Sequence, residues 1–357
     1  MTNFKELLKN FGIDVCCNDM VQPYGDGHIN NTYIVNTQPK YILQGINTNV
    51  FKDPISLMNN IALVTEFLGN KIKENGGNPE VETLTIVKAL DGKNYCEFEG
   101  KFYRVYLFIN GVSYNLPSNE LLFEAGKAFG KFQNQLADFN AELLFESIPN
   151  FHHTRKRFNT LKAAIEADKM GRAASVKDVI DFALSCEKYV DIVVDGIADK
   201  TIPLRVTHND TKINNILFDK ETNQCLSVID LDTVMPGSML YDFGDALRFG
   251  ASSAKEDETN LDTVYCQLDK FEAFTKGFLG EVKTSATARE VELLPLSVLL
   301  LTYECGIRFL TDYLEGDTYF KIHYPEHNID RARNQLKLVA DIETKLDEMS
   351  EIVKKYA

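Results

Sequence analysis

The sequence lacks the cysteine and histidine patterns that build disulfide frameworks or zinc sites. Its 7 cysteines include no Cys-x-x-Cys pair, and its 6 histidines include no His-Glu-x-x-His. His152 and His153 are adjacent, and neighbours on a helix point in different directions. We therefore expect reduced thiols, as in a cytosol, and no zinc site. The basic run at residues 152–158 is expected to be a solvated helix start without a functional role.

Positive charge and long apolar runs are also scarce. The chain has 38 Lys and Arg against 52 Asp and Glu, a net charge of −14, which argues against nucleic acid or an anionic membrane as the main partner. The longest apolar run, residues 293–303, is far short of the roughly 20 residues that span a bilayer. The amino terminus alternates charged and apolar residues and lacks the apolar core of a signal peptide. We expect a cytoplasmic protein that binds a small molecule, with no membrane or nucleic-acid partner and its oligomeric state left open.

A change of character along the 357 residues predicts two lobes. The part up to residue 108 is rich in strand-like segments, and the part from residue 109 onward is rich in long helical segments. The predicted fold class is therefore α+β, with a small β-rich domain over residues 1–108 and a large, mainly helical domain over residues 109–357. The expected strands are 32–35, 40–44 and 101–109, and the expected helices are 53–76, 118–138, about 176–195, 287–315 and 328–355.

Residues 208–215, His-Asn-Asp-Thr-Lys-Ile-Asn-Asn, match the His-x-Asp-x-x-x-x-Asn pattern of kinase catalytic loops. In such a loop Asp210 would accept the proton of an attacking hydroxyl, and Lys212 would offset charge on the transferred phosphoryl group. The alternative is that these Asn and Asp side chains only cap turns, as they often do. The segment therefore predicts phosphoryl transfer but does not prove it.

A metal site would complete this chemistry. Asn215 would offer its amide oxygen to Mg²⁺, and the apolar strand at residues 225–230 would deliver the carboxylate of Asp230 beside it. Asp232 would face the same way if that strand continued, which makes it a possible second metal contact. The literal Asp-Phe-Gly at residues 242–244 also matches a kinase motif. It lies near a predicted helix start, so we expect Asp242 to cap the helix or brace the loop instead of holding metal.

The segment Tyr-Gly-Asp-Gly-His at residues 24–28 is a weaker signal. Its two glycines, Gly25 and Gly27, could let backbone N–H groups approach nucleotide phosphates. Equally, Gly-Asp-Gly is an ordinary hairpin turn. The sequence leaves these two interpretations open.

Several runs together resemble the N-acetylhexosamine 1-kinases of the aminoglycoside phosphotransferase superfamily. They are YGDGHINNTYIV, YILQ, RVYLFI, VTHNDTKINNILFD, VIDLDTVMPGSMLYDFGDALRFGAS and ECGIRFLTDYLEGDTYF. The resemblance implies a bilobal, protein-kinase-like fold that uses ATP and Mg²⁺ to phosphorylate the anomeric hydroxyl of GlcNAc or GalNAc. It also implies nucleotide contacts from Gly25, Gly27, Gln44, Phe108 and Ile109, and sugar contacts from His28, Asn31, Arg308 and Tyr319.

One position departs from the kinase pattern. Many kinase-like folds carry a lysine on the third strand, whereas the corresponding run here, Tyr-Ile-Leu-Gln, ends in Gln44. A neutral amide cannot replace an ammonium charge on the phosphates, so Glu66 on the following helix has no assured lysine partner. Lys40 could reach the site only in a different strand register. What neutralises the phosphates in this lobe is therefore an open question.

The helix expected around residues 303–314 carries Glu304, Arg308 and Asp312 at i, i+4 and i+8. Such a stripe would form a salt-bridge ladder on one helix face, unless Arg308 serves the substrate.

Two further hypotheses compete with the sugar kinase. A kinase for a cationic acceptor such as an aminoglycoside or choline would suit the acidic surface, and Gln44 would suit a nucleotide-binding regulatory module that has lost catalysis.

Overall fold

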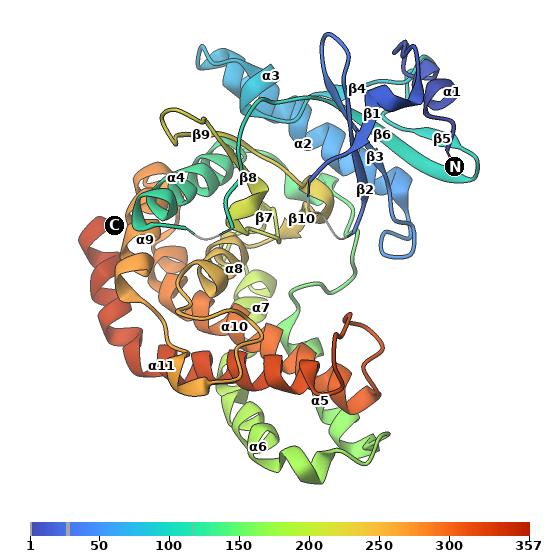
Figure 1. Cartoon of the computed structure of the whole chain (residues 1–357). Helices are drawn as coiled ribbons and strands as arrows, with labels where there is room; N and C mark the ends of the chain where they lie inside the picture. Colours follow the sequence, from blue (N-terminus) through green and yellow to red (C-terminus); the bar gives the residue numbers. More distant parts are fainter. Residues whose placement is uncertain (1, 26–28, 116) are drawn as a thin grey trace. The chain divides into compact units, whose positions relative to one another are not determined.

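The computed structural model describes residues 2–25, 29–115 and 117–357. The chain forms two compact units, each of which is assembled from separate segments (Figure 1). Unit 1 comprises Met1–Ser113, Asp138–Pro149 and Asn215–Pro236, and unit 2 comprises Tyr114–Ala137, Asn150–Asn214 and Gly237–Ala357. The fold class is α+β, as predicted. The expected boundary between two domains at residues 108 and 109 stays a prediction.

Unit 1 is built on a six-stranded antiparallel sheet in the order β1-β2-β3-β6-β4, with β5 also paired to β6 (Figure 1). Strands β2, β3 and β6 confirm the three strands predicted from alternating and β-branched residues, within about two residues at each end. A separate hairpin joins β8 to β9 in antiparallel pairing. The strands of unit 1 are β1 Val21–Pro23, β2 Asn31–Val35, β3 Tyr41–Gly45, β4 Ile86–Val87, β5 Cys96–Phe98, β6 Lys101–Leu107, β8 Ile216–Phe218 and β9 Cys225–Val228.

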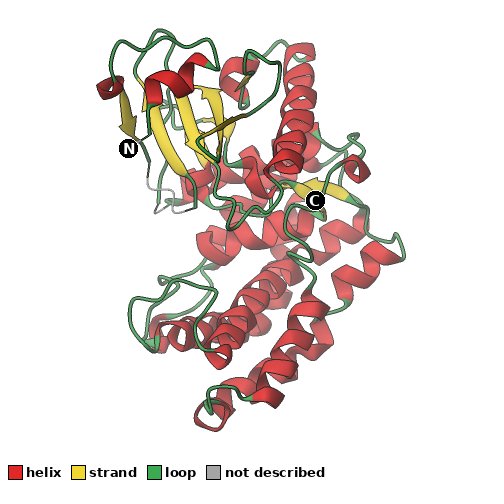
Figure 2. Ribbon diagram, turned by 90° about the vertical axis from the view of Figure 1, so that its right-hand side faces the viewer, coloured by secondary structure: helices red, strands yellow, loops and turns green. Residues whose placement is uncertain are grey.

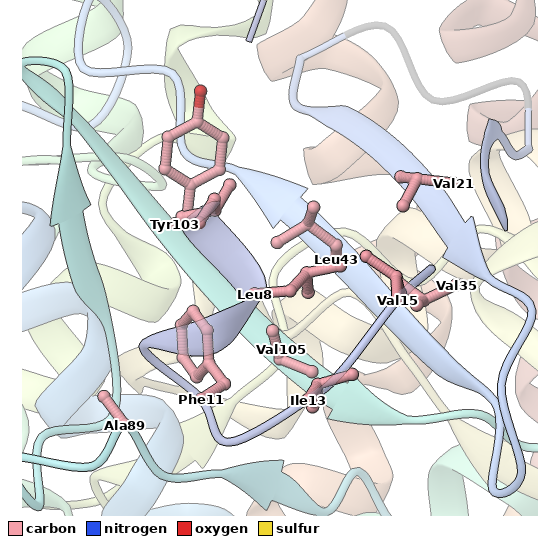
Figure 3. Packing of buried hydrophobic residues seen from close by; sticks show 11 residues of the cluster. Leu8, Phe11, Ile13, Val15, Val21, Val35, Leu43, Ala89, Tyr103 and Val105 are labelled. Atoms are coloured by element: carbon pink, nitrogen blue, oxygen red, sulfur yellow. The ribbon is translucent and has the colours of Figure 1, made fainter. Parts of the chain in front are cut away.

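The two faces of this sheet differ in chemistry because successive side chains of a strand point to opposite faces. Leu43 and Val105 are register partners on β3 and β6 and are fully buried. They belong to the apolar cluster of Figure 3, which also takes in Leu8 of helix α1, Phe4–Lys9. The next register pair, Gln44 and Arg104, therefore faces the other side. Thr32 of β2, the register partner of Gln44, lies on this same face.

Helix α2, Pro54–Glu74, packs against that second face. The side chain of Asp53 caps the helix by accepting the Ser56 N–H at 3.0 Å, and Pro54 occupies the first turn, so the predicted helix start is confirmed. Met58 on its buried side brings its sulfur within 3.9 Å of Arg104 Nη1. The short helix α3 covers Pro79–Glu82.

Unit 2 is mainly helical, and Figure 2 shows its helices in red. The helices predicted over 118–138, 287–315 and 328–355 are confirmed by α4, α10 and α11. Its helices are α4 Asn119–Gln135, α5 Thr154–Ala167, α6 Lys177–Ser185, α7 Ile192–Ala198, α8 Met239–Gly250, α9 Leu268–Val282, α10 Ala288–Glu315 and α11 His327–Tyr356. The short strand β7, Arg205–Thr207, leads into the predicted catalytic loop, and β10, Met235–Gly237, precedes α8.

The single helix predicted over about 176–195 is wrong. The chain forms α6, then a tight 3₁₀ turn at Cys186–Tyr189, and then the short helix α7. Ala183, Cys186 and Val190 are all buried across this interruption. The apolar spacing that predicts one helix is thus preserved while the backbone hydrogen bonding changes from α to 3₁₀.

Glycines let the helices of unit 2 approach each other closely. A Cβ on Gly126 of α4 would lie 2.2 Å from the Phe274 carbonyl oxygen of α9, and a Cβ on Gly277 of α9 would lie 2.1 Å from the Phe123 carbonyl oxygen of α4. The same holds for Gly244 of α8, whose Cβ would lie 2.3 Å from the Ser297 carbonyl oxygen of α10. Side chains larger than hydrogen at these points would force the helices apart.

Helix α10 is long and apolar enough to cross a membrane. The sequence analysis considered only residues 293–303, a run that is too short to do so. In the structure, 83% of its most apolar window is buried inside the protein. Burial of this kind is typical of a core helix. A capping box between Thr287 and Glu290 starts the helix, and Gly316 ends it in the left-handed conformation with φ of 103°.

Candidate active site

The predicted catalytic loop follows β7, and Asp242 of α8 holds its backbone. The Asp242 carboxylate accepts the N–H groups of His208 at 2.9 Å and Asn209 at 2.8 Å, as well as the side-chain amide of Gln133 at 2.7 Å. Asp242 is fully buried, and burial raises the pKa of its carboxyl above the ordinary value. Ser238, not Asp242, caps α8. Of the two roles expected for Asp242, bracing the loop is therefore the correct one.

A second carboxylate of α8 holds the next part of the loop. Asp245 accepts the Thr211 N–H at 3.0 Å, and the Thr211 hydroxyl donates to the Asp242 carbonyl at 2.7 Å. Arg248, on the same helix, ion-pairs with Asp245 at 3.1 Å. Sequence reasoning missed Asp245, Thr211 and Gln133. The signal for Asp245 was present, because two aspartates at i and i+3 share one face of a helix.

Asp210, the predicted base, pairs with Lys212 of the same loop. Lys212 Nζ lies 2.8 Å from Asp210 Oδ1, with 40% and 29% of the two side chains exposed. Burial lowers the pKa of Lys212, but the carboxylates of Asp210 and Asp245 outweigh it, so the pKa lies above the ordinary value. The loop thus presents a carboxylate and an ammonium group side by side, both reachable from solvent. A hydroxyl acceptor and a transferring phosphoryl group would need this pair of charges.

The predicted metal ligands lie at the two ends of the β8–β9 hairpin in unit 1. Asn215 directly precedes β8, and its carbonyl accepts the Ile229 N–H at 2.8 Å. Asp230 follows Ile229 in the left-handed conformation, with φ of 60°, and its side chain is exposed. The hairpin therefore returns the chain from Asn215 to a point one residue before Asp230, although the strand ends at Val228 and not at Asp230. That Asn215 and Asp230 share a metal ion stays a prediction. An amide oxygen and a carboxylate are hard ligands of the kind that Mg²⁺ takes together with several waters.

Asp232 does not lie on a continued strand, so the condition under which it would face the same way as Asp230 is not met. The strand ends at Val228, and Asp232 lies in a 3₁₀ turn, Leu231–Thr233, because the left-handed residue Asp230 redirects the backbone. Its Oδ1 lies 2.5 Å from Arg104 Nη1, and its Oδ2 accepts from Asn30 Nδ2 at 2.5 Å. Both carboxylate oxygens are engaged within unit 1. Its role as a second metal contact stays a prediction.

Gln44 belongs to the same buried network. Its Oε1 accepts from Arg104 Nε at 2.9 Å, and its Nε2 donates to Thr32 Oγ1 at 3.0 Å. Burial lowers the pKa of Arg104, but nearby negative groups, chiefly Asp232, outweigh it and raise the pKa well above the ordinary value. Sequence reasoning missed Arg104 and Asn30. An isolated arginine inside an otherwise apolar strand was the signal for Arg104.

Of the other predicted nucleotide residues, Phe108 and Gly25 lie near each other in unit 1. The ring of Phe108 meets the ring of Tyr24, the neighbour of Gly25, edge to face with centroids 5.9 Å apart. Gly25 has φ of 75°, a conformation that favours glycine. Ile109 is buried next to Phe108, and Asn31 is exposed at the start of β2. Gly27 and His28 lie outside the described residues.

The lysine and glutamate discussed for the third strand take other positions. Lys40 precedes β3 with its Nζ 5.8 Å from the centre of the Phe108 ring, and Glu66 is exposed on α2. The β3 register therefore does not bring Lys40 to the position of Gln44.

The candidate sugar residues Arg308 and Tyr319 meet in unit 2. Arg308 Nη2 lies 3.5 Å from the Tyr319 hydroxyl, and its guanidinium lies 5.5 Å from the centre of the Phe151 ring. Tyr319 is 68% exposed. A guanidinium and a phenol on a partly aromatic surface are suited to hydrogen-bonding sugar hydroxyls while packing on the ring.

The salt-bridge ladder, one of the two alternatives left open for the charged stripe on α10, does not form. Among the described residues no ion pair joins Glu304, Arg308 and Asp312, because each has partners away from the stripe. Glu304 accepts from His152 Nδ1 at 2.7 Å and Thr154 Oγ1 at 3.0 Å. Burial raises the pKa of Glu304, but His152 and nearby arginines outweigh it and lower the pKa overall. The segment 152–158, which the sequence left without a role, therefore anchors α10.

Asp312 shapes the loop that carries Tyr319. Its carboxylate accepts three successive backbone N–H groups, from Thr318 at 2.9 Å, Tyr319 at 2.8 Å and Phe320 at 2.9 Å. Asn328 of α11 donates to the same carboxylate at 2.8 Å. The placement of Tyr319 thus depends on a buried acid that touches only the backbone of the loop.

Comparison with known proteins agrees with this geometry. Residues 21–272 match the family model described as "Phosphotransferase enzyme family". A spectinomycin phosphotransferase solved with ADP and spectinomycin is 15% identical, with a TM-score of 0.58 over 95% of this chain and 97% of that chain. A microcompartment-associated aminopropanol kinase is 14% identical, with a TM-score of 0.59 over 97% and 98%.

An ethanolamine kinase from Plasmodium vivax is 15% identical, with a TM-score of 0.56 over 93% of this chain and 87% of that chain. At these identities the solved structures establish a shared fold. The family match spans more than half of the chain and includes both ends of the β8–β9 hairpin and the braced loop. The chain belongs to the phosphotransferase enzyme family.

Proposed function

We propose that this phosphotransferase transfers the γ-phosphoryl group of ATP to the anomeric hydroxyl of GlcNAc or GalNAc. The observation that carries the phosphoryl-transfer step is the partly exposed Asp210–Lys212 pair, 2.8 Å apart, on a loop whose backbone is fixed by two carboxylates of α8. The sugar rests on the resemblance of the sequence to the N-acetylhexosamine 1-kinases and on the pairing of Arg308 with Tyr319.

In the proposed reaction Asp210 accepts the proton as the anomeric oxygen forms a bond to the γ-phosphorus. The bond between that phosphorus and the oxygen of the leaving ADP breaks, and the products are ADP and hexosamine 1-phosphate. Lys212 offsets negative charge on the transferred group. Asn215 and Asp230 would hold Mg²⁺, which when bound offsets charge on the nucleotide phosphates. Asp242 and Asp245 keep the loop fixed so that Asp210 needs little rearrangement to act.

A kinase for a small cationic alcohol is the second candidate. Solved neighbours carry the names of spectinomycin, aminopropanol and ethanolamine, and the net charge of −14 would attract a cation. A panel of GlcNAc, GalNAc, choline, ethanolamine and kanamycin, followed by ADP release, distinguishes these candidates. ADP release with GlcNAc or GalNAc supports the proposal, and release with only the cationic acceptors would replace it. Binding of ATP without turnover of any acceptor would favour a regulatory module.

Methyl glycosides of GlcNAc are expected to bind the enzyme without being phosphorylated. Methylation removes the proton that Asp210 would accept but leaves the rest of the sugar for recognition. Competition kinetics against GlcNAc measure the binding, and phosphorus NMR of the mixture detects any phosphate ester. An ester at another ring position would refute phosphorylation of the anomeric hydroxyl.

Arg308→Met is expected to raise KM for the sugar by about tenfold or more, since a hydrogen bond to a charged group is worth roughly 1.5–3 kcal/mol. KM for ATP should change little, because the nucleotide residues named above lie in unit 1. The matched control is Arg331→Met, which removes another arginine packed on a ring, 5.3 Å from the centre of Phe309. Equal sugar KM values for both variants would remove Arg308 from the sugar site.

A further inference from the structure

We propose that Arg104 on β6, oriented by Gln44, replaces the lysine that kinase-like folds usually carry on the third strand, and that it does so by fixing Asp232 and the segment that carries Asp230. The inference rests on the proposed use of MgATP, which it deepens. Gln44 and Arg104 are direct register partners on neighbouring strands. The charge has therefore moved sideways by one strand and stays on the same face of the sheet.

The contacts of Gln44 explain why an amide occupies the lysine position. Its carbonyl oxygen accepts from Arg104 Nε at 2.9 Å, and its NH₂ group donates to Thr32 Oγ1 at 3.0 Å. A lysine at residue 44 would place a second cation beside the guanidinium and could not accept its hydrogen bond. Gln44 thus serves as the hydrogen-bond acceptor of Arg104, and it is not simply a lysine position that has lost its function.

Arg104 reaches from the sheet to the segment that follows β9. Its Nη1 lies 2.5 Å from Asp232 Oδ1, with only 1% and 5% of the two side chains exposed. Asp232 is two residues from Asp230, the proposed metal ligand, and Asp230 also interacts electrostatically with Arg104. Asn30, which follows the glycine-containing segment, holds the other oxygen of Asp232 at 2.5 Å. One guanidinium therefore links the sheet to the residues proposed to bind metal and nucleotide.

The burial of this pair argues for more than sheet stability. A buried ion pair stabilises a fold little compared with apolar residues of similar size, because both charges lose their hydration. The pair contacts the sulfur of Met58 on one side and the amides of Gln44 and Asn30 on others, so the site is built to hold these two charges. What the pair adds is a fixed positive charge beside Asp232, which holds that carboxylate in place. Arg104 acts through Asp232, so it is a positioning residue.

The test moves the charge back to the third strand. We would measure the Kd of MgATP by calorimetry without sugar for Arg104→Gln, Arg104→Lys and the double variant Gln44→Lys/Arg104→Gln. Arg104→Gln should weaken MgATP binding by about tenfold or more, as for the loss of a charged hydrogen bond. Arg104→Lys and the double variant should both bind within about threefold of wild type, a difference under 1 kcal/mol. KM for the sugar should change in none of them.

Arg205→Gln and Arg205→Lys are the matched controls. Arg205 forms a comparably buried pair with Glu290, 2.5 Å apart, with 9% and 0% of the side chains exposed. These variants should lose stability in a denaturant titration while their folded fraction keeps the wild-type Kd for MgATP. Wild-type affinity in folded Arg104→Gln would overturn the proposal.

Should Arg104→Gln not fold, the double variant still decides. Recovery of folding and MgATP binding supports a transferable charge, whereas folded protein with tenfold weaker binding contradicts it. A wild-type protein that binds MgATP but phosphorylates no sugar would refute the proposed acceptor and leave the role of Arg104 intact.

Discussion

Asp210→Asn is expected to lower kcat by about 10²-fold to 10⁴-fold, the effect of removing a positioned proton acceptor. The amide of asparagine has nearly the shape of the carboxylate but cannot take up the proton of the attacking hydroxyl. The fold should survive, because Asp210 is partly exposed and the backbone of the loop is held by Asp242 and Asp245. Steady-state kinetics measure kcat, and calorimetry should give an unchanged Kd for MgATP.

Asp262→Asn is the control for this experiment, since Asp262 is an exposed aspartate of the same unit. It removes one negative charge from the surface without touching the loop, and it should leave kcat at the wild-type value. Turnover at the wild-type rate in Asp210→Asn would mean that another group takes the proton.

Asp230→Asn should abolish Mg²⁺-dependent turnover while changing the free energy of unfolding by less than about 1 kcal/mol. The side chain is exposed and its residue has φ of 60°, a conformation that asparagine adopts as readily as aspartate. The backbone turn after β9 is therefore retained. What disappears is the anionic oxygen that a divalent cation requires. Kinetics over a range of Mg²⁺ concentrations, with a denaturant titration, measure both effects.

Asp242→Asn is the informative comparison, because it makes the same chemical change in the residue that a motif search would select. Its NH₂ group would face backbone N–H donors, and a buried donor left without an acceptor costs about 1–3 kcal/mol. We expect a clear loss of stability, residual activity in the folded fraction and an unchanged affinity for Mg²⁺. Metal affinity that survives in Asp230→Asn and vanishes in Asp242→Asn would reverse our assignment.

Much of the fold and of the loop could be predicted from the sequence, because the signals are local. The α2 start follows from Asp53-Pro54, and the strands follow from runs of β-branched and aromatic residues. That Asp242 has a supporting role, by capping the helix or by bracing the loop, followed from its place near a helix start and beyond the β9 strand. These predictions needed only spacing along the chain.

The parts that failed depend on partners distant in sequence. The i, i+4 spacing of charged residues on α10 can be seen in the sequence, and it suggested a salt-bridge ladder. The actual partner of Glu304 is His152, which lies 152 residues away along the chain. Whether the strand continued to Asp232 was left open, because the neighbouring residues give no signal that Asp230 turns the backbone. The pairing of Gln44 with Arg104 across 60 residues likewise needs the register of the sheet, which the sequence does not provide.

Residues 242–244 spell Asp-Phe-Gly, the tripeptide whose aspartate holds Mg²⁺ in protein kinases. Here each letter serves another purpose: Asp242 braces the loop, Phe243 packs edge to face with Phe271, Phe274 and Phe278, and Gly244 admits the Ser297 carbonyl oxygen. A survey that scored this tripeptide would class the chain as active because of three residues that stabilise its fold. It would equally discard as a pseudoenzyme any relative that altered the tripeptide yet kept the counterpart of Asp230.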